Sequence, residues 1–197
     1  MAVILLPLIT ILLASLASLV HAIPSVKAIQ VGAGNCSAFP STFVGAGDNA
    51  DGFVFSPDQA DDSSINGLTT GITGSTLVVY KNSTDVLETI FCCDFGGTIL
   101  DGFGIRSLLL PPTISNDTQL AYMSEGIKPQ TYVHEVNGTR QAGTFLGWAN
   151  VTTWAFKTAT WNPDFWQMRL LVSESGDSKG ASLSEGEFMG FLKVQLP

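Results

Sequence analysis

Basic charge is scarce in this sequence, and that scarcity excludes one broad class of partner. The 197 residues include 9 lysines and arginines against 17 aspartates and glutamates, so the net charge is −8. Because no cluster of Lys or Arg accompanies this acidity, the chain has no footprint for a phosphate backbone, and we exclude nucleic acid. Intrinsic disorder is excluded too, because 45% of the residues are hydrophobic and 10% are aromatic.

Cysteine is scarce as well. The chain has 3 cysteines, Cys36, Cys92 and Cys93, and no CxxC pair, which argues against a zinc or redox site. One disulfide is expected in an oxidising compartment, and Cys36 can reach only one of the adjacent pair, since neighbouring strand residues point to opposite faces. Phe91 and Cys93 share the parity of the expected core face, which leaves Cys92 more accessible. The partner of Cys36 stays open between Cys92 and Cys93.

There is one long apolar run, at residues 2–20. It is followed by Val20-His21-Ala22, which has small residues at positions −3 and −1 of a cleavage site after Ala22. This arrangement is typical of a secretory signal peptide, and we expect cleavage after Ala22. The competing interpretation is a membrane anchor, but the run barely reaches the ~20 residues that span a bilayer and Pro7 interrupts it. We therefore expect a signal peptide at 1–22 and a single secreted β-domain at 23–197, with no GPI anchor and no stable membrane insertion.

Asparagine sequons support the same route. Five of the eight asparagines lie in N-x-S/T sequences, where chance predicts about 1.5. The competing interpretation is a Ser/Thr-rich sheet protein that forms sequons by accident, and it is the weaker one. We therefore predict an extracellular, disulfide-bonded glycoprotein. The predicted glycosylation sites are Asn35, Asn82, Asn116, Asn137 and Asn150.

Histidine, with 2 residues, leaves little room for catalysis. A Ser-His-Asp triad would have to use His134, and no GxSxG elbow is present. If cleavage fell after Val20, His21 would become N-terminal and could pair with His134 as a copper-binding brace, which would resemble secreted copper-dependent polysaccharide monooxygenases. Because Ala22 is the better cleavage residue, we expect no catalytic residue, no metal site and no cofactor.

Carboxylates offer two further hypotheses. An acidic cluster could supply oxygens to Ca²⁺, but the EF-hand pattern fails and a solvated loop is favoured. The cluster consists of Asp48, Asp51, Asp58, Asp61 and Asp62. A glycoside hydrolase on a β-sandwich would need two paired carboxylates, and no glutamate lies in a recognisable signature. The available glutamates are Glu88, Glu125, Glu135, Glu174, Glu185 and Glu187.

Short β-type segments and turns fill most of the chain after the apolar run, with no convincing helical period. Asn137-Gly138 and Asp101-Gly102 are two-residue hairpin signals. This pattern predicts an all-β fold, either an antiparallel β-sandwich or a jelly roll, with a β-barrel as the alternative. The predicted strands are 76–81, 86–94, 103–110, 131–136, 144–149, 153–158, 165–173 and 188–195.

All 4 tryptophans lie within one short segment, at Trp148, Trp154, Trp161 and Trp166. A row of exposed Trp rings could form a ligand platform for carbohydrate, whereas aromatic residues also dominate the cores of sandwiches. Parity places Trp154 and Phe156 on one strand face, with Lys157 opposite. We favour a largely buried cluster, with the chain turning at 149–152.

The apolar leader, the chain length and the region from Gly147-Trp148 to Phe165-Trp166 resemble small secreted β-sandwich proteins of ascomycete fungi. The resemblance covers the last third of the chain, and most of those proteins have no assigned activity, so it implies no residue role. We expect a non-catalytic protein of the cell surface, the cell wall or a host interface. Cell-wall polysaccharide and a host or surface protein are the expected partners. The alternatives are a carbohydrate-binding module that uses the Trp148–Trp166 cluster, and a β-sandwich glycoside hydrolase or copper-dependent oxidase.

Overall fold

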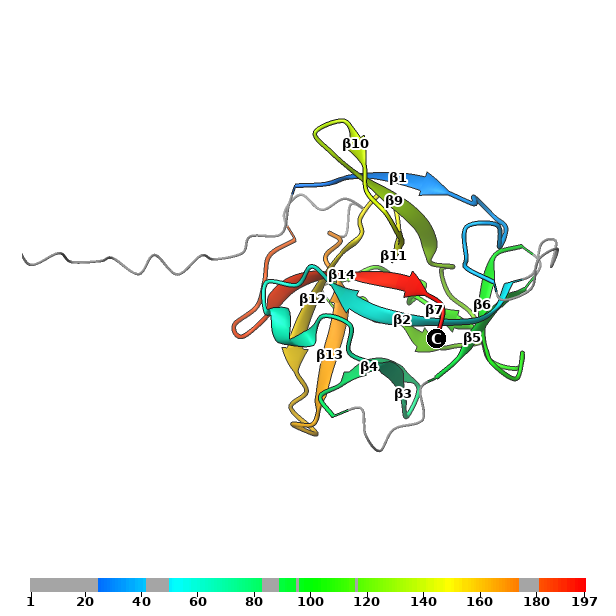
Figure 1. Ribbon diagram of the computed structural model, residues 1–197. Coiled ribbons are helices and arrows are strands. Elements are labelled where there is room, and N and C mark those ends of the chain that lie inside the picture. Colours follow the sequence, from blue (N-terminus) through cyan, green and yellow to red (C-terminus); the bar gives the residue numbers. More distant parts are fainter. Residues whose placement is uncertain (1–24, 42–49, 83–88, 95, 116, 174–180) are drawn as a thin grey trace, which may run out of the picture.

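The computed structural model describes residues 25–41, 50–82, 89–94, 96–115, 117–173 and 181–197 (Figure 1). The predicted signal peptide, Asn116, Asp48, Glu88 and Glu174 lie outside these residues. Among the helices of the described ranges, none is long and apolar enough to cross a membrane.

Antiparallel strands make up the described chain, together with one 3-10 turn, η1 (Ser63–Ile65). The strands are β1 (Lys27–Val31), β2 (Ala50–Asp58), β3 (Thr70–Thr73), β4 (Thr76–Tyr80), β5 (Phe91–Asp94), β6 (Thr98–Asp101), β7 (Leu108–Leu109), β8 (Ala121–Tyr122), β9 (Gln130–Val136), β10 (Thr139–Arg140), β11 (Thr144–Gly147), β12 (Thr153–Thr158), β13 (Phe165–Leu170) and β14 (Phe188–Gln195).

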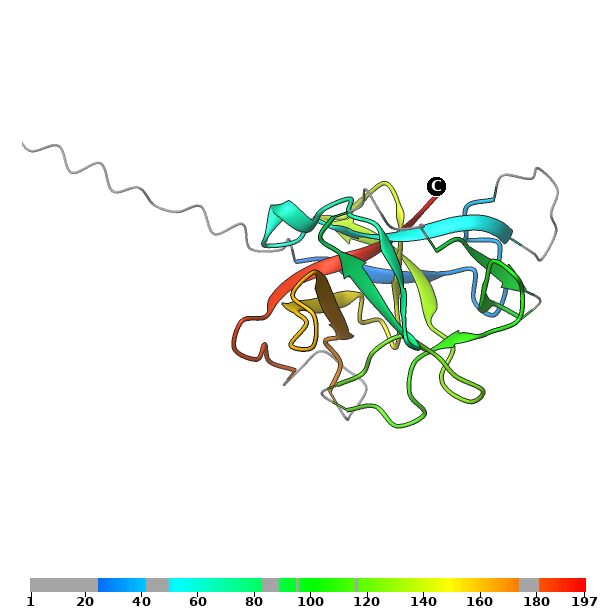
Figure 2. The same cartoon turned by 90° about the horizontal axis from the view of Figure 1, so that it is seen from below.

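Strand β14 lies at the centre of the sheet, whose main order is β1-β9-β11-β14-β12-β13-β4-β8-β7. Its residue Phe191 pairs with Thr153 of β12 and with Asp58 of β2, while Leu192 pairs with β11 and with β2. Thus β11 and β12 pair one after the other with the same edge of β14, and β2 pairs with its other edge. Strand β5 then pairs with β2, and β6 pairs with β5. The sheet curls around its core as a half-barrel (Figure 2). The predicted all-β antiparallel class is confirmed, and this curled sheet stands between the sandwich and barrel alternatives.

The core lies inside the curl, and alternation along the strands decides which side chains enter it. Phe53 and Phe55 of β2 are fully buried, as are Trp154 and Phe156 of β12. Trp154 also donates a 2.9 Å hydrogen bond from Nε1 to the carbonyl oxygen of Leu146, so its one polar atom is satisfied.

Of the two predicted two-residue hairpins, the one at Asn137-Gly138 is confirmed, whereas the chain at Asp101-Gly102 opens into the longer loop 102–106. Asn137 and Gly138 have φ values of 50° and 77°, the left-handed conformation that a two-residue hairpin requires, and they join β9 to β10. Strands β12 and β14 have the predicted bounds, 153–158 and 188–195. The chain turns at 149–152 as predicted, because Trp148 and Val151 form a bridge around Ala149 and Asn150, at φ values of 50° and 64°.

The strand predicted at 103–110 is wrong for most of its length. Only Leu108–Leu109 forms a strand there, and residues 102–106 form an exposed loop. The physical reason is that the Asp101 carboxylate accepts hydrogen bonds from the backbone of Ile105 and Arg106, which holds the chain in a loop that alternation alone cannot reveal.

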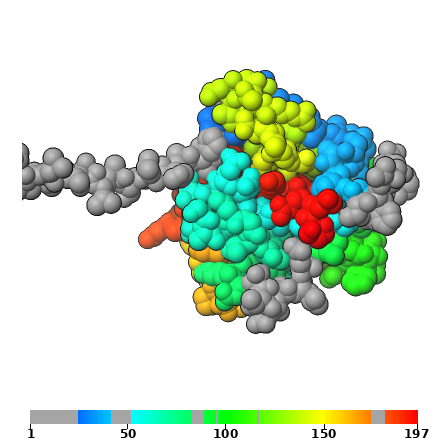
Figure 3. Space-filling model, in the orientation of Figure 1, coloured from blue at the N-terminus to red at the C-terminus, as the bar shows by residue number. Residues whose placement is uncertain are grey.

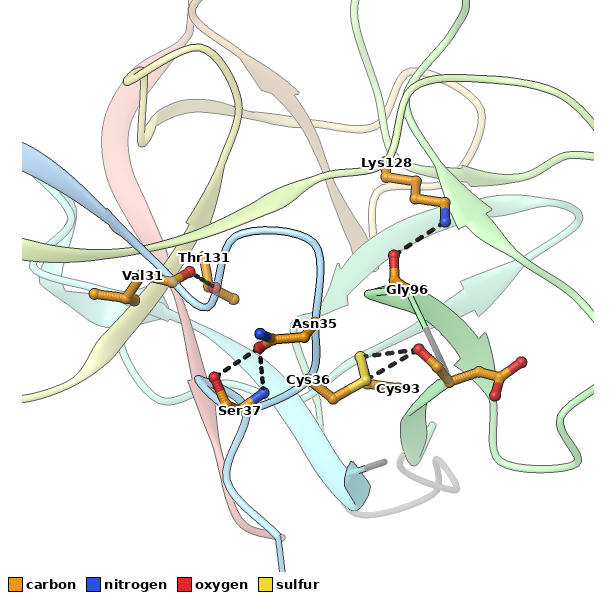
Figure 4. Close-up of a disulfide and its surroundings, with 9 residues drawn as sticks. Val31, Asn35, Cys36, Ser37, Cys93, Gly96, Lys128 and Thr131 are labelled. Carbon is orange, nitrogen blue, oxygen red and sulfur yellow. Dashed lines mark hydrogen bonds between the residues drawn. A yellow bond between two sulfur atoms is a disulfide. The ribbon is translucent and has the colours of Figure 1, made fainter. Parts of the chain in front are cut away.

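The disulfide joins Cys36 to Cys93, with Cα atoms 5.7 Å apart (Figure 4). Both cysteines are 2% exposed, whereas Cys92 is half-buried and donates from Sγ to the carbonyl oxygen of Asp101. The bridge fastens the segment after β1 to β5. The core parity predicted for Phe91 and Cys93 is confirmed, and it decides the pairing that the sequence left open.

Candidate functional site

The four tryptophans do not form one platform. Trp154 is fully buried in the core, and Trp148 and Trp166 are partly buried against it, so the hypothesis of a four-ring platform is wrong. The physical reason is strand alternation, which turns Trp154 and Trp166 toward the inside of the curled sheet. Trp161 differs from the others, because it lies in the β12–β13 hairpin loop and is 50% exposed.

Trp161 belongs to an aromatic trio at one end of the sheet. Its ring centroid lies 5.1 Å from that of Phe165, at an interplanar angle of 45°. Phe165 pairs across strands with Tyr80, and their ring centroids lie 5.1 Å apart in an edge-on arrangement. Phe165 and Tyr80 are half-buried, so they support Trp161 and leave part of the aromatic surface open to solvent.

A polar cleft continues from this trio along the same outer face. Phe165 and Gln167 are two residues apart on β13 and therefore share a face, and Gln167 pairs with Lys157 of β12. The cleft has a volume of about 200 Å³. Its polar side chains are those of Asp117, Gln119, Lys157, Thr160, Gln167, Arg169, Ser184 and Glu187. We name the trio and this cleft together the β12–β13 surface.

Some of these polar groups are available to a ligand. The side chains of Gln119, Lys157, Thr160 and Gln167 make no hydrogen bond with other described residues, although amides and an ammonium group are strong hydrogen-bonding groups. Two glutamine amides, a hydroxyl and an ammonium beside exposed aromatic rings can bind a polyhydroxylated ring, with apolar contact on one face and hydrogen bonds at its edges.

The floor of the cleft is fixed by an ion pair between Arg169 and Glu187, whose side chains are 7% and 8% exposed. Arg169 donates from Nε and Nη2 to the two carboxylate oxygens at 2.8 and 2.7 Å, a bidentate arrangement. The Ser184 amide donates to the same carboxylate at 2.6 Å. The hydrogen bonds from Arg169 hold the pKa of Glu187 below its usual value. This carboxylate is thus a structural anion.

Histidine 134 is fully buried, which removes it from surface chemistry. Its ring stacks on Phe145 at 3.8 Å between centroids and meets Phe191 edge-on, and its Nε2 lies 2.8 Å from Thr152 Oγ1. Nδ1 has no hydrogen-bond partner among the described residues. The hypothesis of a copper brace gains no support from this position, because the imidazole is enclosed by aromatic rings; His21 lies outside the described residues.

Burial of His134 should make stability depend on pH. Desolvation lowers its pKa from 6.5 to about 4, against a smaller opposing effect of Asp58. Between these values the unfolded chain binds more protons than the folded chain, so stability is complete above pH 6.5 and falls as the pH drops toward 4. We expect a loss of up to about 3 kcal/mol. Urea unfolding across this pH range should show that the free energy of unfolding of His134→Gln depends less on pH than that of the native chain. An equal pH dependence in both proteins would contradict the assignment.

The other acidic residues are dispersed. Asp62 caps η1 by accepting from the Ser64 amide, Asp61 accepts from the Met189 amide, and Glu135 pairs with Lys27 at 3.6 Å. Glu125 and Glu185 are exposed. Within the described ranges no group of three or more His, Cys, Asp or Glu side chains could hold a metal ion. Asp117 and Glu187 do line one cleft, the polar cleft of the β12–β13 surface.

The described sequons lie mostly on exposed turns. Asn82, Asn137 and Asn150 are exposed, and the β9–β10 hairpin that contains Asn137 forms the top of the molecule (Figure 3). Asn35 is half-buried, and its Oδ1 accepts hydrogen bonds from the Ser37 amide and hydroxyl at 2.9 and 2.6 Å (Figure 4).

A second cleft, of about 220 Å³, lies beside the disulfide. It is lined largely by glycine backbone and by the polar side chains of Gln30, Asn35 and Gln130, and Lys128 donates from Nζ to the Gly96 carbonyl oxygen across it. With its one ammonium group already bound and no exposed aromatic ring in its lining, this cleft offers less to a ligand than the β12–β13 surface.

No protein-family model matches this chain, and no curated protein matches it. The assignment of a site therefore rests on geometry. The sequence predicted Trp161 as a candidate site residue, but it did not predict that Phe165 and Tyr80 pack together beside it or that Gln167 and Lys157 line the adjoining cleft. The signal that could have found Tyr80 and Phe165 is aromatic pairing across strands, but it requires knowing that β4 pairs with β13.

Proposed function

We propose that this protein is a secreted, N-glycosylated, non-catalytic protein of the cell surface, wall or host interface that binds carbohydrate through the β12–β13 surface. The observation that supports it most is the half-exposed Trp161, which packs on Phe165 beside a cleft whose glutamine amides make no hydrogen bond with other described residues. A sugar ring that stacks on Trp161 would cover its exposed aromatic face, while its hydroxyl groups would meet the polar side chains of the cleft.

Secretion is supported by three features that do not depend on one another. The apolar run at 2–20 is typical of a signal peptide, and disulfides form and persist in oxidising compartments. The described sequons at Asn82, Asn137 and Asn150 are exposed. A glycan is bulky and needs such exposed positions.

Binding without hydrolysis is favoured by the state of the cleft carboxylates. A glycosidase needs a general acid whose pKa is raised, so that it keeps a proton near neutral pH. Glu187 is instead held as an anion by Arg169, and its pKa is lowered. Asp117, the other carboxylate in the lining of this cleft, is exposed to solvent. The lowered pKa of Glu187 does not suit a general acid, so this arrangement favours recognition of a ligand over bond cleavage.

Replacing Trp161 by alanine should weaken binding of a wall polysaccharide at least about tenfold, which corresponds to roughly 1.4 kcal/mol. The substitution removes the exposed ring and leaves the core unchanged, because Trp161 lies in a loop. Isothermal titration of the secreted protein with soluble chito-oligosaccharide, β-glucan, xylan and mannan would measure it. Phe103→Ala, at a ring that is 87% exposed on another part of the molecule, is the matched control and should bind as the native chain does. Equal affinity of the Trp161 variant would disprove the assignment.

Mass spectrometry of the protein recovered from culture medium tests secretion separately. We expect Ile23 as the first residue and hexose-containing glycans on Asn82, Asn137 and Asn150, whose turns face solvent. An unprocessed N-terminus, or peptides with none of these asparagines modified, would contradict the secretory route.

A further inference from the structure

The loop between β6 and β7 presents the most exposed apolar side chains of the described chain. Phe103 is 87% exposed and Ile105 is 79% exposed, and they are separated only by Gly104. Ile90, which is 45% exposed, lies against Gly102 at the base of the loop. Isolated apolar side chains on a surface need no explanation, but three at one tip mark an interaction site. We name Ile90, Phe103 and Ile105 the apolar tip.

The loop that forms this tip is held rigidly. Asp101 is 3% exposed, and its carboxylate accepts from the amides of Ile105 and Arg106 at 2.8 and 3.3 Å and from Arg106 Nε at 2.8 Å. The Gly104 amide donates to the Asp101 carbonyl oxygen at 2.7 Å, and Gly104 has a φ of 71° that favours glycine. With so many bonds to one carboxylate, the loop does not collapse to hide Phe103 and Ile105.

A polar layer lies directly behind the apolar tip. The Arg106 guanidinium stacks over the ring of Tyr122 at 4.2 Å, and the Arg106 side chain is 55% exposed. The Tyr122 hydroxyl is buried, so its ring supports Arg106 while the half-exposed guanidinium remains open to solvent. Apolar side chains at the end of a loop, with an exposed arginine next to them, match the order of acyl chains and headgroups at the surface of a bilayer.

We propose that the apolar tip inserts shallowly and reversibly into the interface of a zwitterionic phospholipid bilayer. The tip offers Phe103, Ile105 and part of Ile90, far less than the ~800 Å² per partner of a stable protein interface, whereas interfacial attachment needs only a few apolar side chains. The net charge of −8 disfavours anionic lipids and leaves neutral ones. A second copy is a poor partner, because the two clefts described above are lined mainly by polar groups and glycine.

This proposal does not depend on carbohydrate binding. In both ribbon views the β6–β7 region lies on the opposite side of the molecule from the β12–β13 hairpin (Figures 1 and 2). A protein that used both surfaces would bind sugar on one side and lipid on the other.

Flotation of the mature protein with phosphatidylcholine vesicles tests the proposal. The native chain should float with the vesicles, and Phe103→Ser and Ile105→Ser should each lower the partition coefficient about tenfold, since each removes an apolar side chain that would be buried in the bilayer interface. The matched control is Leu183→Ser, at a leucine that is 39% exposed outside the tip, and it should float as the native chain does. Because both tip residues are exposed, the thermal midpoint of the variants should equal that of the native chain.

Two outcomes would overturn the proposal. Either the native chain does not float, or it floats equally well after both tip substitutions. If the native chain does not float with vesicles, and the tip substitutions abolish its self-association or its capture by a protein, the tip serves a protein partner and the lipid proposal fails. Loss of sugar binding by Trp161→Ala has no bearing on this test, so the two proposals fail independently.

Discussion

Removal of the disulfide in the double variant Cys36→Ala/Cys93→Ala should lower the free energy of unfolding by about 4 kcal/mol. The bridge closes a loop between residues 57 positions apart, and opening it returns that loop entropy to the unfolded chain. Both cysteines are buried, at 2% exposure, so alanine is chosen to avoid placing a hydroxyl in the core. The double variant also prevents Cys92 from forming a replacement bond with a remaining partner.

Urea unfolding monitored by circular dichroism measures this effect. Cys92→Ala is the matched control, because Cys92 is half-buried and lies outside the disulfide. Its free energy of unfolding should differ from that of the native chain by less than about 1 kcal/mol. A double variant as stable as the native chain would show that the segment after β1 is held by packing alone. A large loss in the Cys92 variant would instead indicate that Cys92 forms the bridge.

Replacing Glu187 by alanine should cost about 3 to 5 kcal/mol, because it leaves the Arg169 guanidinium buried without a counter-charge. Arg169 is 6% exposed, and its remaining described bond from Nη2 is to the Ser182 carbonyl oxygen at 2.8 Å. The bidentate pair therefore fixes the segment before β14 to β13 and shapes the floor of the cleft.

The double variant Arg169→Met/Glu187→Leu separates a missing counter-charge from lost packing. It removes both charges and should recover more than half of the loss, since two apolar side chains of similar volume can replace a buried ion pair. Glu185→Ala, at an exposed neighbour, should stay within about 0.5 kcal/mol of the native chain. Equal unfolding midpoints for Glu187→Ala and Glu185→Ala would contradict the structural role of the pair.

Local chemistry explains which parts of the fold could be predicted from the sequence. Asn137-Gly138 specifies its hairpin without knowledge of other strands, because both residues tolerate a positive φ. Alternation placed Trp154 and Phe156 on one face, and both are in the core. These features depend on neighbouring residues alone.

Long-range pairing could not be predicted in the same way. Val54 pairs with Gln195 and Lys27 with Glu135, and no local pattern specifies such registers. The strand predicted at 103–110, after the hairpin signal Asp101-Gly102, is mostly absent because the Asp101 carboxylate holds residues 102–106 in an exposed loop. The candidate site depended on the same missing information, since Tyr80 joins Phe165 only through the pairing of β4 with β13.

Acrylamide quenching of tryptophan fluorescence tests the central claim, that the β12–β13 surface binds carbohydrate, most directly. Trp161, at 50% exposure, should supply most of the quenchable emission, and Trp161→Phe should remove it, because Trp154 is buried and Trp148 and Trp166 are partly buried. A soluble chito-oligosaccharide or β-glucan that stacks on Trp161 should protect the native emission from acrylamide in a saturable manner. Quenching that none of chito-oligosaccharide, β-glucan, xylan and mannan alters would contradict the account.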